Sequence, residues 1–360
     1  MMNLPPYALY LTTFAGALLI SLIAAPQIIA IAGKRQLFDV PDNDRTLHKH
    51  TTPSLGGVAI FFAYIIVTSL VVQPSVFDKW HYMIATSLLF FLTGLMDDLV
   101  ALSAWKKLIA QLIPIFIIVI PGDVRVQSLY GLFGVGELSY ATSIFITIFS
   151  ITFFTNAFNF IDGIDGLAGS MGVLYTTILG FCLAVTGNIG AAAVSFSLAG
   201  ATAGFLWYNI TPAKLFMGDT GSLLLGFTIS VLSVLFINSY DPDREIFNWI
   251  HDGQLAIIFC LALLSLPIAD CLRVFFIRMS KGISPMRADR NHLHYFLLDA
   301  GLRDLQAVGV ILSVNMLFVL AAYLIQGMGS RALFIVLCVM SAIFFTIVFF
   351  VRRKHKRMVL

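Results

Sequence analysis

Five aspartates in this chain stand directly beside long apolar runs, where a carboxylate needs a specific partner. Asp97 and Asp98 close one run in GLMDDLV, and Asp162 and Asp165 follow another in NAFNFIDGIDGLAG. Asp219 precedes a third run in KLFMGDTGS. An ionised side chain at such a boundary is costly unless it meets a metal, a base or water. This pattern predicts a functional site rather than a solvated surface.

The spacing of these aspartates indicates the binding of a metal together with a phosphate. Asp162 and Asp165 are one helical turn apart, so they could face one ligand, and the glycines that flank them allow close approach. Asp219 opens an apolar helix inside GDTGS, and a helix N-terminus favours a phosphate. Hard oxygen ligands beside phosphate-binding groups favour Mg²⁺, with Mn²⁺ as the alternative.

Basic residues near these motifs supply partners for phosphate. Lys107 follows the Asp97 and Asp98 pair, and a compact ammonium group suits a phosphate that enters from the lipid plane. A second cationic group lies between 279 and 304 and is of the kind that grips a pyrophosphate. Taken singly, an aspartate pair at a helix end is usually a cap and a lone histidine an interfacial side chain, but their coincidence predicts one shared site. The second group consists of Arg287, Arg290, His292 and His294.

The elements that position these residues are transmembrane helices. Of the 360 residues 59% are hydrophobic and 11% are charged, against roughly 25% charged in soluble domains, and the mean hydropathy is +0.92. A soluble enzyme is therefore excluded. Uncharged runs long enough to cross the bilayer predict an all-α polytopic membrane protein with about eleven spans. They lie near residues 7–32, 55–73, 81–96, 105–120, 138–159, 167–185, 189–208, 222–240, 253–271, 305–325 and 332–351.

The distribution of Lys and Arg predicts which side each loop faces. With a cytoplasmic C-terminus, only Lys79, Arg125, Arg244 and Arg331 of the 22 basic residues lie outside, as the positive-inside rule requires. The N-terminus is then outside, and every motif named above lies on the cytoplasmic side. Residues 121–139 read as a small outer β-hairpin, and residues 279–304 as a cytoplasmic substrate-binding loop within one domain, 1–360. The net charge of +3 gives no reason to expect a nucleic-acid partner.

The order of the motifs resembles a known enzyme family. DRTLHKHTTPSLGG, MDD, NAFNFIDGIDGLAG, FMGDTGS and SPMRADRNHLHY follow one another as in polyprenyl-phosphate N-acetylhexosamine-1-phosphate transferases, over residues 34–304. The subgroup most similar is the bacterial undecaprenyl-phosphate N-acetylglucosaminyl-1-phosphate transferases, which begin O-antigen and other cell-surface polysaccharides. The resemblance implies transfer of a sugar 1-phosphate from a UDP-N-acetylhexosamine to undecaprenyl phosphate, with release of UMP, at the cytoplasmic face of the bacterial inner membrane with Mg²⁺. It leaves a homodimer open.

The same resemblance implies roles for individual residues. Asp219 would bind the metal with Asn159 as a second ligand, and Asp162 and Asp165 would order the nucleotide-sugar and metal site. Asp97 would be the base for the lipid phosphate, or would position it, with Asp98 as its neighbour. Lys107 would contact that phosphate, and the Arg287, Arg290, His292 and His294 group would hold the diphosphate and sugar. His48 and the PSLGG segment would wall the cleft.

Two departures and two alternatives accompany this interpretation. Tyr295 stands where the subgroup often has a third histidine, and Thr46 stands where a cation is expected before the first histidine. The related phospho-N-acetylmuramoyl-pentapeptide transferases carry DDxxK and a longer histidine run, which DDLVA and NHLHY do not match. A cation-coupled transporter would place its carboxylates near the middle of the membrane on broken helices, whereas here they gather at one surface.

Overall fold

The computed structural model describes residues 5–35, 52–240, 253–285 and 289–359, and these residues form an almost entirely helical bundle. Helix-forming apolar runs dominate because every backbone group inside a bilayer must be hydrogen-bonded within the protein. The helices are α1 (Pro6–Arg35), α2 (Gly56–Val71), α3 (Trp80–Val100), α4 (Ala104–Val119), α5 (Tyr140–Phe160), α6 (Leu167–Val185), α7 (Ile189–Asn209), α8 (Gly218–Asn238), α9 (Gly253–Leu263), α10 (Ser265–Ser280), α11 (Leu293–Asp299), α12 (Asp304–Leu324) and α13 (Ser330–Val359), with a 3₁₀ turn at Gln326–Met328.

The described residues contain eight helices that are long and apolar enough to cross a membrane, so the protein is a multi-pass membrane protein. The bent pair α9 and α10 makes a ninth span if the two helices cross together. α2 and α4, with 16 residues each, are shorter. One helix forms at each of ten of the predicted spans, whereas the predicted span 253–271 is divided between α9 and α10. The eleven-span count and the orientation stay predictions.

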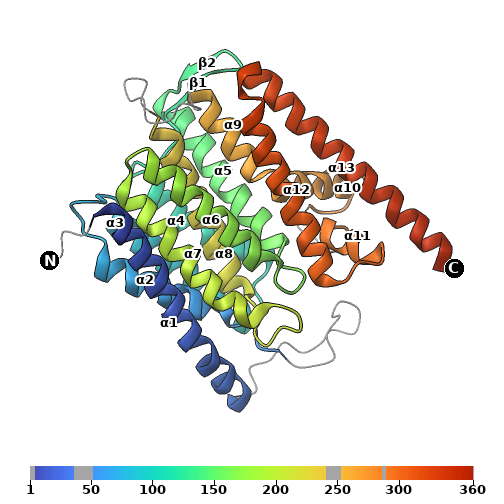
Figure 1. The fold of residues 1–360 in the computed structure, drawn as a ribbon, viewed down its shortest axis with the longest axis horizontal. Coiled ribbons are helices and arrows are strands. Elements are labelled where there is room, and N and C mark those ends of the chain that lie inside the picture. The colour runs from blue at the N-terminus through green and yellow to red at the C-terminus, as the bar shows by residue number, and fades with distance from the viewer. Residues whose placement is uncertain (1–4, 36–51, 241–252, 286–288, 360) are drawn as a thin grey trace.

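The predicted hairpin between 121 and 139 is confirmed. β1 (Ser128–Leu132) and β2 (Val135–Glu137) pair antiparallel, with Leu132 opposite Val135. Phe133 and Gly134 both have positive φ, 55° and 83°, which is the type I′ geometry that matches the twist of the two strands. The hairpin lies at the opposite end of the bundle from α11 (Figure 1).

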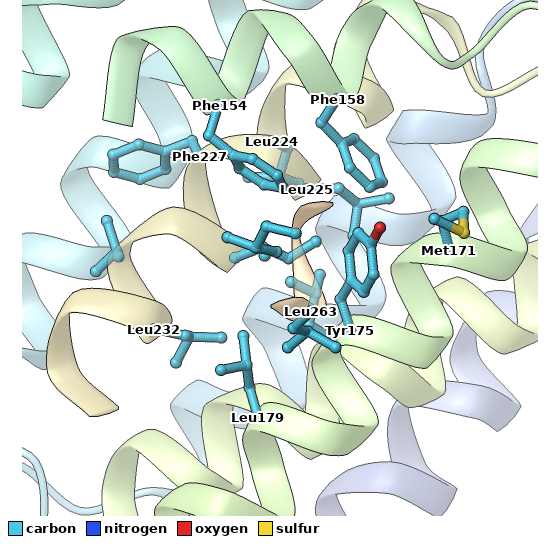
Figure 2. Close-up of a cluster of buried hydrophobic side chains, with 14 of the residues drawn as sticks. Phe154, Phe158, Met171, Tyr175, Leu179, Leu224, Leu225, Phe227, Leu232 and Leu263 are labelled. Carbon is cyan, nitrogen blue, oxygen red and sulfur yellow. The ribbon is translucent and has the colours of Figure 1, made fainter. Parts of the chain in front are cut away.

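α8 is the central helix of the bundle. In the most apolar stretch of α8, 94% of the residues are buried. The corresponding shares are 17% for α1 and 11% for α13, which lie at the outside of the bundle (Figure 1). Mostly aromatic and leucine side chains of α5, α6 and α9 interlock with those of α8. Dense packing of this kind takes the place of a hydrophobic driving force inside lipid. Figure 2 shows Phe154 and Phe158 of α5, Met171, Tyr175 and Leu179 of α6, Leu224, Leu225, Phe227 and Leu232 of α8, and Leu263 of α9.

Glycines let three helices converge at the first turn of α8. A Cβ at Gly57 of α2 would lie 2.1 Å from the backbone N of Gly221, and one at Gly94 of α3 would lie 2.4 Å from Cα of Thr220. Backbone hydrogen bonds support this contact, since the amides of Gly56 and Gly57 donate to the carbonyls of Phe216 and Met217 at 2.8 and 2.9 Å. The PSLGG segment therefore holds the start of α8 in place.

The bend between α9 and α10 has an identifiable cause. The two helices differ in direction by 67°. Pro267 has no amide hydrogen, so it cannot bond the carbonyl of Leu263 four residues earlier. Asn315 of α12 satisfies that carbonyl instead at 2.9 Å, and its own oxygen accepts from the Tyr175 hydroxyl at 2.8 Å. Such replacement partners allow a broken helix at membrane depth.

Candidate active site

Four polar side chains from four helices meet where α3, α4, α5 and α8 end or begin at one end of the bundle. The Lys107 ammonium lies 3.0 Å from Asp97 Oδ2 and 2.8 Å from Asp219 Oδ2, and 3.3 Å from Asn159 Oδ1. Asn159 Nδ2 donates in turn to Asp219 Oδ1 and, at 2.7 Å, to Ser222 Oγ. Asp219 is the most accessible of the charged groups, with 28% of its side chain exposed against 8% for Asp97. The arrangement places one cation between two carboxylates at one end of the helical bundle.

Asp98 has a different function from its neighbour in the sequence. Its Oδ1 accepts from the backbone N of Asp219 at 2.7 Å, and its Oδ2 accepts from the backbone N of Thr220 at 2.9 Å and from the Thr220 hydroxyl. Asp98 thus caps the N-terminus of α8 from another helix, where a negative charge is favourable. The sequence led us to expect a phosphate at these amides, and the structure shows them bonded to Asp98.

The turn at residues 161–166, between α5 and α6, separates its two aspartates. Asp165 is buried, and its Oδ2 accepts from the backbone N of Ala213 at 3.0 Å in the loop before α8. Asp162 precedes Gly163 in the same turn, and Asp165 follows it two residues later. Burial, followed by repulsion from Asp219, Asp98 and Asp165, raises the pKa of Asp162 to about 8. The other carboxylates of the site therefore act on Asp162, and the hydrogen bond of Asp165 joins the 161–166 turn to the loop before α8.

The NHLHY segment packs directly behind the same turn. His294 is buried, and a Cβ added to Gly163 would lie 2.2 Å from its Nε2 atom. Burial lowers the pKa of His294 to about 3, so this ring is neutral at pH 7. The ring of His292 is parallel to it, with centroids 5.9 Å apart. Arg290 is exposed, and its guanidinium lies 4.9 Å from the ring centroid of Tyr295.

The predicted site residues thus fall into three groups. Lys107 contacts Asp97, Asn159 and Asp219, and Asn159 also contacts Asp219. Asp162 lies near enough for the charge of Asp219 to contribute to its raised pKa. Asp98, Asp165 and His292 are hydrogen-bonded to the protein itself. His294 packs against Gly163, and its Nε2 has no hydrogen-bond partner among the described residues. Arg290 is the solvent-facing basic residue of the NHLHY region that the structure describes. His48 and Arg287 lie outside the described residues.

Two polar groups of the site were missed by the sequence reasoning. Gln111 and Asn156 exchange side-chain hydrogen bonds at 2.8 and 3.4 Å, one turn from the contact between Lys107 and Asn159. Asp270, a buried carboxylate in α10, contacts His292. A lone acidic residue within an apolar run was the available signal for Asp270, because such residues are rarely placed there without a function.

Three relatives show where this chain belongs. The chain is 32% identical over 321 residues, 87% of its length and 84% of the relative's, to a Bacillus subtilis protein named "Probable undecaprenyl-phosphate N-acetylglucosaminyl 1-phosphate transferase". It is 30% identical over 336 residues, 86% of its length and 81% of the relative's, to the decaprenyl-phosphate N-acetylglucosaminephosphotransferase of Mycolicibacterium smegmatis. The Escherichia coli K12 undecaprenyl-phosphate alpha-N-acetylglucosaminyl 1-phosphate transferase is 28% identical over 307 residues, 84% and 78% of the two chains.

The chain belongs to the polyprenyl-phosphate N-acetylglucosaminyl 1-phosphate transferase family. The family model for glycosyl transferase family 4 also matches it, over residues 80–237. The protein is therefore a glycosyl-1-phosphate transferase. The matched region of this transferase contains all five aspartates of the site, together with Lys107 and Asn159. Asp270 and the NHLHY segment lie beyond it, although His294 of that segment packs against Gly163 in the matched region.

Proposed function

We propose that this transferase moves N-acetylglucosamine 1-phosphate, or a related N-acetylhexosamine 1-phosphate, from a UDP-sugar to undecaprenyl phosphate and releases UMP. The observation that carries the proposal is the position of Lys107 between Asp97 and Asp219. These residues lie at the end of the bundle where α3 ends and α4 and α8 begin. A cation held at this end suits a phosphate whose polyprenyl chain remains in the lipid. The names of the relatives supply the sugar and the lipid.

The reaction exchanges one phosphoanhydride bond for another. An oxygen of the lipid phosphate attacks the phosphorus that carries the sugar, and a new P–O–P bond forms. The bond from that phosphorus to the bridging oxygen breaks, and UMP leaves with the electron pair. Little covalent chemistry falls to the protein in phosphoryl transfer, so its main contributions are orientation and the neutralisation of charge.

We infer from the contacts that different side chains contribute different parts of this work. Lys107 binds the acceptor phosphate. Asp97 orients Lys107, because one of its oxygens faces the ammonium and the other accepts from the backbone N of Leu102 at 2.6 Å. Because both oxygens of Asp97 already have partners, they support a role in positioning Lys107 rather than in removing a proton from the lipid phosphate. A phosphate monoester with a second pKa of about 6 is also largely dianionic at neutral pH, so it needs no base. Asp98 keeps α8 in register so that the side chain of Asp219 faces the site.

Mg²⁺ is the cofactor that this donor set fits. No group of three His, Cys, Asp or Glu side chains in the described ranges is arranged to hold a metal. Mg²⁺ commonly takes only one or two carboxylates and completes its shell with waters and substrate phosphates. Asp219 and Asp162 would supply the carboxylates and Asn159 an amide oxygen, and the mutual repulsion of these carboxylates favours a cation between them. The metal would neutralise charge on the donor diphosphate.

We place the reaction at the cytoplasmic face of the bacterial inner membrane, as the first step of a cell-surface polysaccharide such as O-antigen. The excess of Lys and Arg on the predicted inner loops supports this side, since UDP-sugars are cytosolic. Arg290 faces solvent at this end of the bundle, where a nucleotide-sugar would enter.

The test is the release of UMP by purified protein supplied with undecaprenyl phosphate, Mg²⁺ and one UDP-sugar at a time. We expect UMP with UDP-N-acetylglucosamine, or with another UDP-N-acetylhexosamine, and none when the lipid phosphate is omitted. Turnover only with UDP-N-acetylmuramoyl-pentapeptide would identify the peptidoglycan enzyme instead. Absence of turnover with every donor, together with cation flux in proteoliposomes, would favour a transporter.

A further inference from the structure

Asp270 is a buried carboxylate to which the proposed reaction gives no role. It is 2% exposed and lies in α10, five residues after Ser265, where the helix begins. A charge at such a position costs several kcal/mol unless hydrogen-bonded partners surround it. Those partners show what the residue does.

Asp270 has one partner in its own helix and two at the start of α11, so it joins α10 to α11. Oδ1 accepts from Arg273 Nη2 at 2.7 Å and from the backbone N of Leu293 at 3.0 Å. Oδ2 pairs with Nδ1 of His292 at 2.9 Å. Arg273 also donates to the carbonyl of Asn291. Asp270 and Arg273 therefore hold three consecutive residues of the NHLHY segment, at positions 291–293.

The pairing also determines how the His292 ring is used. When Nδ1 donates its hydrogen to Asp270, Nε2 of the neutral ring is an acceptor, and it faces Arg278 Nη2 at 3.4 Å. Arg278 is itself buried and forms a two-point contact with Asp289, at 3.0 and 3.1 Å. Both nitrogens of His292 thus have protein partners. The ring is a structural link within the protein and not a free ligand for a diphosphate.

The hydrogen bond between Asp270 and His292 lies between two residues of the segment that are near the site, His294 and Arg290. On one side, the His292 ring is parallel to that of His294, which packs on Gly163 next to Asp162. On the other side, Arg290 precedes the held residues and lies over Tyr295. The position of Arg290 and the support of the Asp162 turn both depend on where residues 291–293 are held.

We propose that Asp270 is a positioning residue for the nucleotide-sugar, acting through His292 to hold Arg290 and the Asp162 turn in the geometry that binds the donor. This inference rests on the proposed function. It also changes the expectation for the basic residues of this region: Arg273 and Arg278 are paired with Asp270 and Asp289, so among the arginines that the structure describes here Arg290 is the one proposed to meet the substrate.

The test compares Asp270→Asn with wild type in two measurements. In steady-state kinetics, we expect the KM for UDP-N-acetylglucosamine to rise about 10-fold to 100-fold, as is typical when a partner that orients a binding group is removed. The KM for undecaprenyl phosphate should stay within about twofold, because Lys107 has its polar partners Asp97, Asn159 and Asp219 in α3, α5 and α8. In hydrogen–deuterium exchange, amides 291–296 should exchange faster, since the Leu293 amide loses its carboxylate partner.

Two further variants keep the result interpretable. His292→Phe retains a flat ring while losing both hydrogen bonds, so it should raise the donor KM similarly even if Asp270→Asn does not fold. The double variant should be no worse than the more affected single variant, because both substitutions break one link. Asp123→Asn is the control: it weakens an arginine–carboxylate pair at the hairpin end, at a left-handed residue where Asn is well tolerated, and should change neither KM.

Each outcome decides between the two ideas. If wild type releases no UMP from any UDP-sugar, the proposed function fails and this inference falls with it. If wild type is active while Asp270→Asn leaves donor KM and exchange unchanged, only the inference fails. An equal rise in both KM values, or effects of the two single variants that multiply, would also overturn it, since either result indicates a general loss of structure.

Discussion

Asp98, in the last turn of α3, accepts a hydrogen bond of 2.7 Å from the backbone N of Asp219, the second residue of α8. The two aspartates are 121 positions apart, and one holds the main chain of the other. The charge of Asp98 meets the positive end of α8, while the side chain of Asp219 remains directed at Lys107. Neighbouring aspartates in MDD therefore serve different purposes, and the predictions that follow separate them.

Asp98→Ala is expected to destabilise the protein. The substitution leaves the first amides of α8 and the Thr220 hydroxyl without their acceptor, which typically costs about 1–3 kcal/mol per buried group. Thermal unfolding in detergent should show a lower midpoint than for wild type. Asp78→Ala, which removes an exposed carboxylate paired with Lys79, is the control and should leave the midpoint unchanged. Equal midpoints for all three proteins would show that the cap contributes nothing.

Asp219→Asn should leave folding intact and reduce UMP release by about 100-fold or more. The amide keeps the shape of the side chain and the backbone contact with Asp98, but it loses the charge that faces Lys107 and that Mg²⁺ would use. Turnover would be measured at saturating donor and acceptor on protein with wild-type thermal stability. Near-normal turnover of such a protein would remove Asp219 from the metal site.

Gly163→Ala tests whether the turn and the NHLHY segment act together. The added Cβ would lie 2.2 Å from Nε2 of His294, and the buried ring has little room to withdraw. We expect a loss of donor affinity of about tenfold or more, measured by direct binding of UDP-N-acetylglucosamine. Gly136→Ala in the hairpin meets no atom within 4 Å and should bind as wild type does. Unchanged affinity in Gly163→Ala would show that this contact is dispensable.

Metal-free protein should lose stability as the pH rises toward 8, in part because of Asp162. Burial and neighbouring carboxylates raise its pKa to about 8 in the folded state, whereas the pKa of an aspartate in the unfolded chain is about 3.9. Between these values the folded protein binds more protons, so this group lowers the free energy of unfolding as pH increases. In EDTA, the free energy of unfolding should therefore decrease less between about pH 5 and about pH 8 for Asp162→Asn than for wild type. Parallel curves for the two proteins would contradict the shifted pKa.

Thiol labelling of intact cells tests the orientation. A cysteine at Gly136, an exposed residue of the hairpin, should react with an impermeant reagent, and one at Lys281, exposed after α10, should react only after permeabilisation. The background needs Cys338→Ser, because the other three native cysteines are buried. The reverse pattern would place the site outside, and labelling of both positions would show that the number of spans between them is wrong.

The amino-acid sequence by itself determined the architecture and the end of the molecule that carries the site. Long uncharged runs must become helices because a bilayer offers the backbone no hydrogen bonds, and one helix formed at each predicted span except 253–271, which is divided between α9 and α10. Phe133 and Gly134 between two short alternating segments were enough to specify the hairpin. Asp97, Asp162 and Asp219 could be grouped from the sequence, because each stands next to the same boundary of an apolar run.

Only the tertiary structure decided which charges neutralise one another. Lys107 and Asn159 are 52 positions apart, and Asp98 and Thr220 are 122 apart, so their contacts depend on how far each helix is rotated and on glycines that let backbones touch. The same holds for Asp270, whose carboxylate meets His292 because Pro267 bends the helix that carries it. Motif spacing describes neighbours along one helix, whereas hydrogen bonds between helices depend on packing, which is a property of the whole bundle.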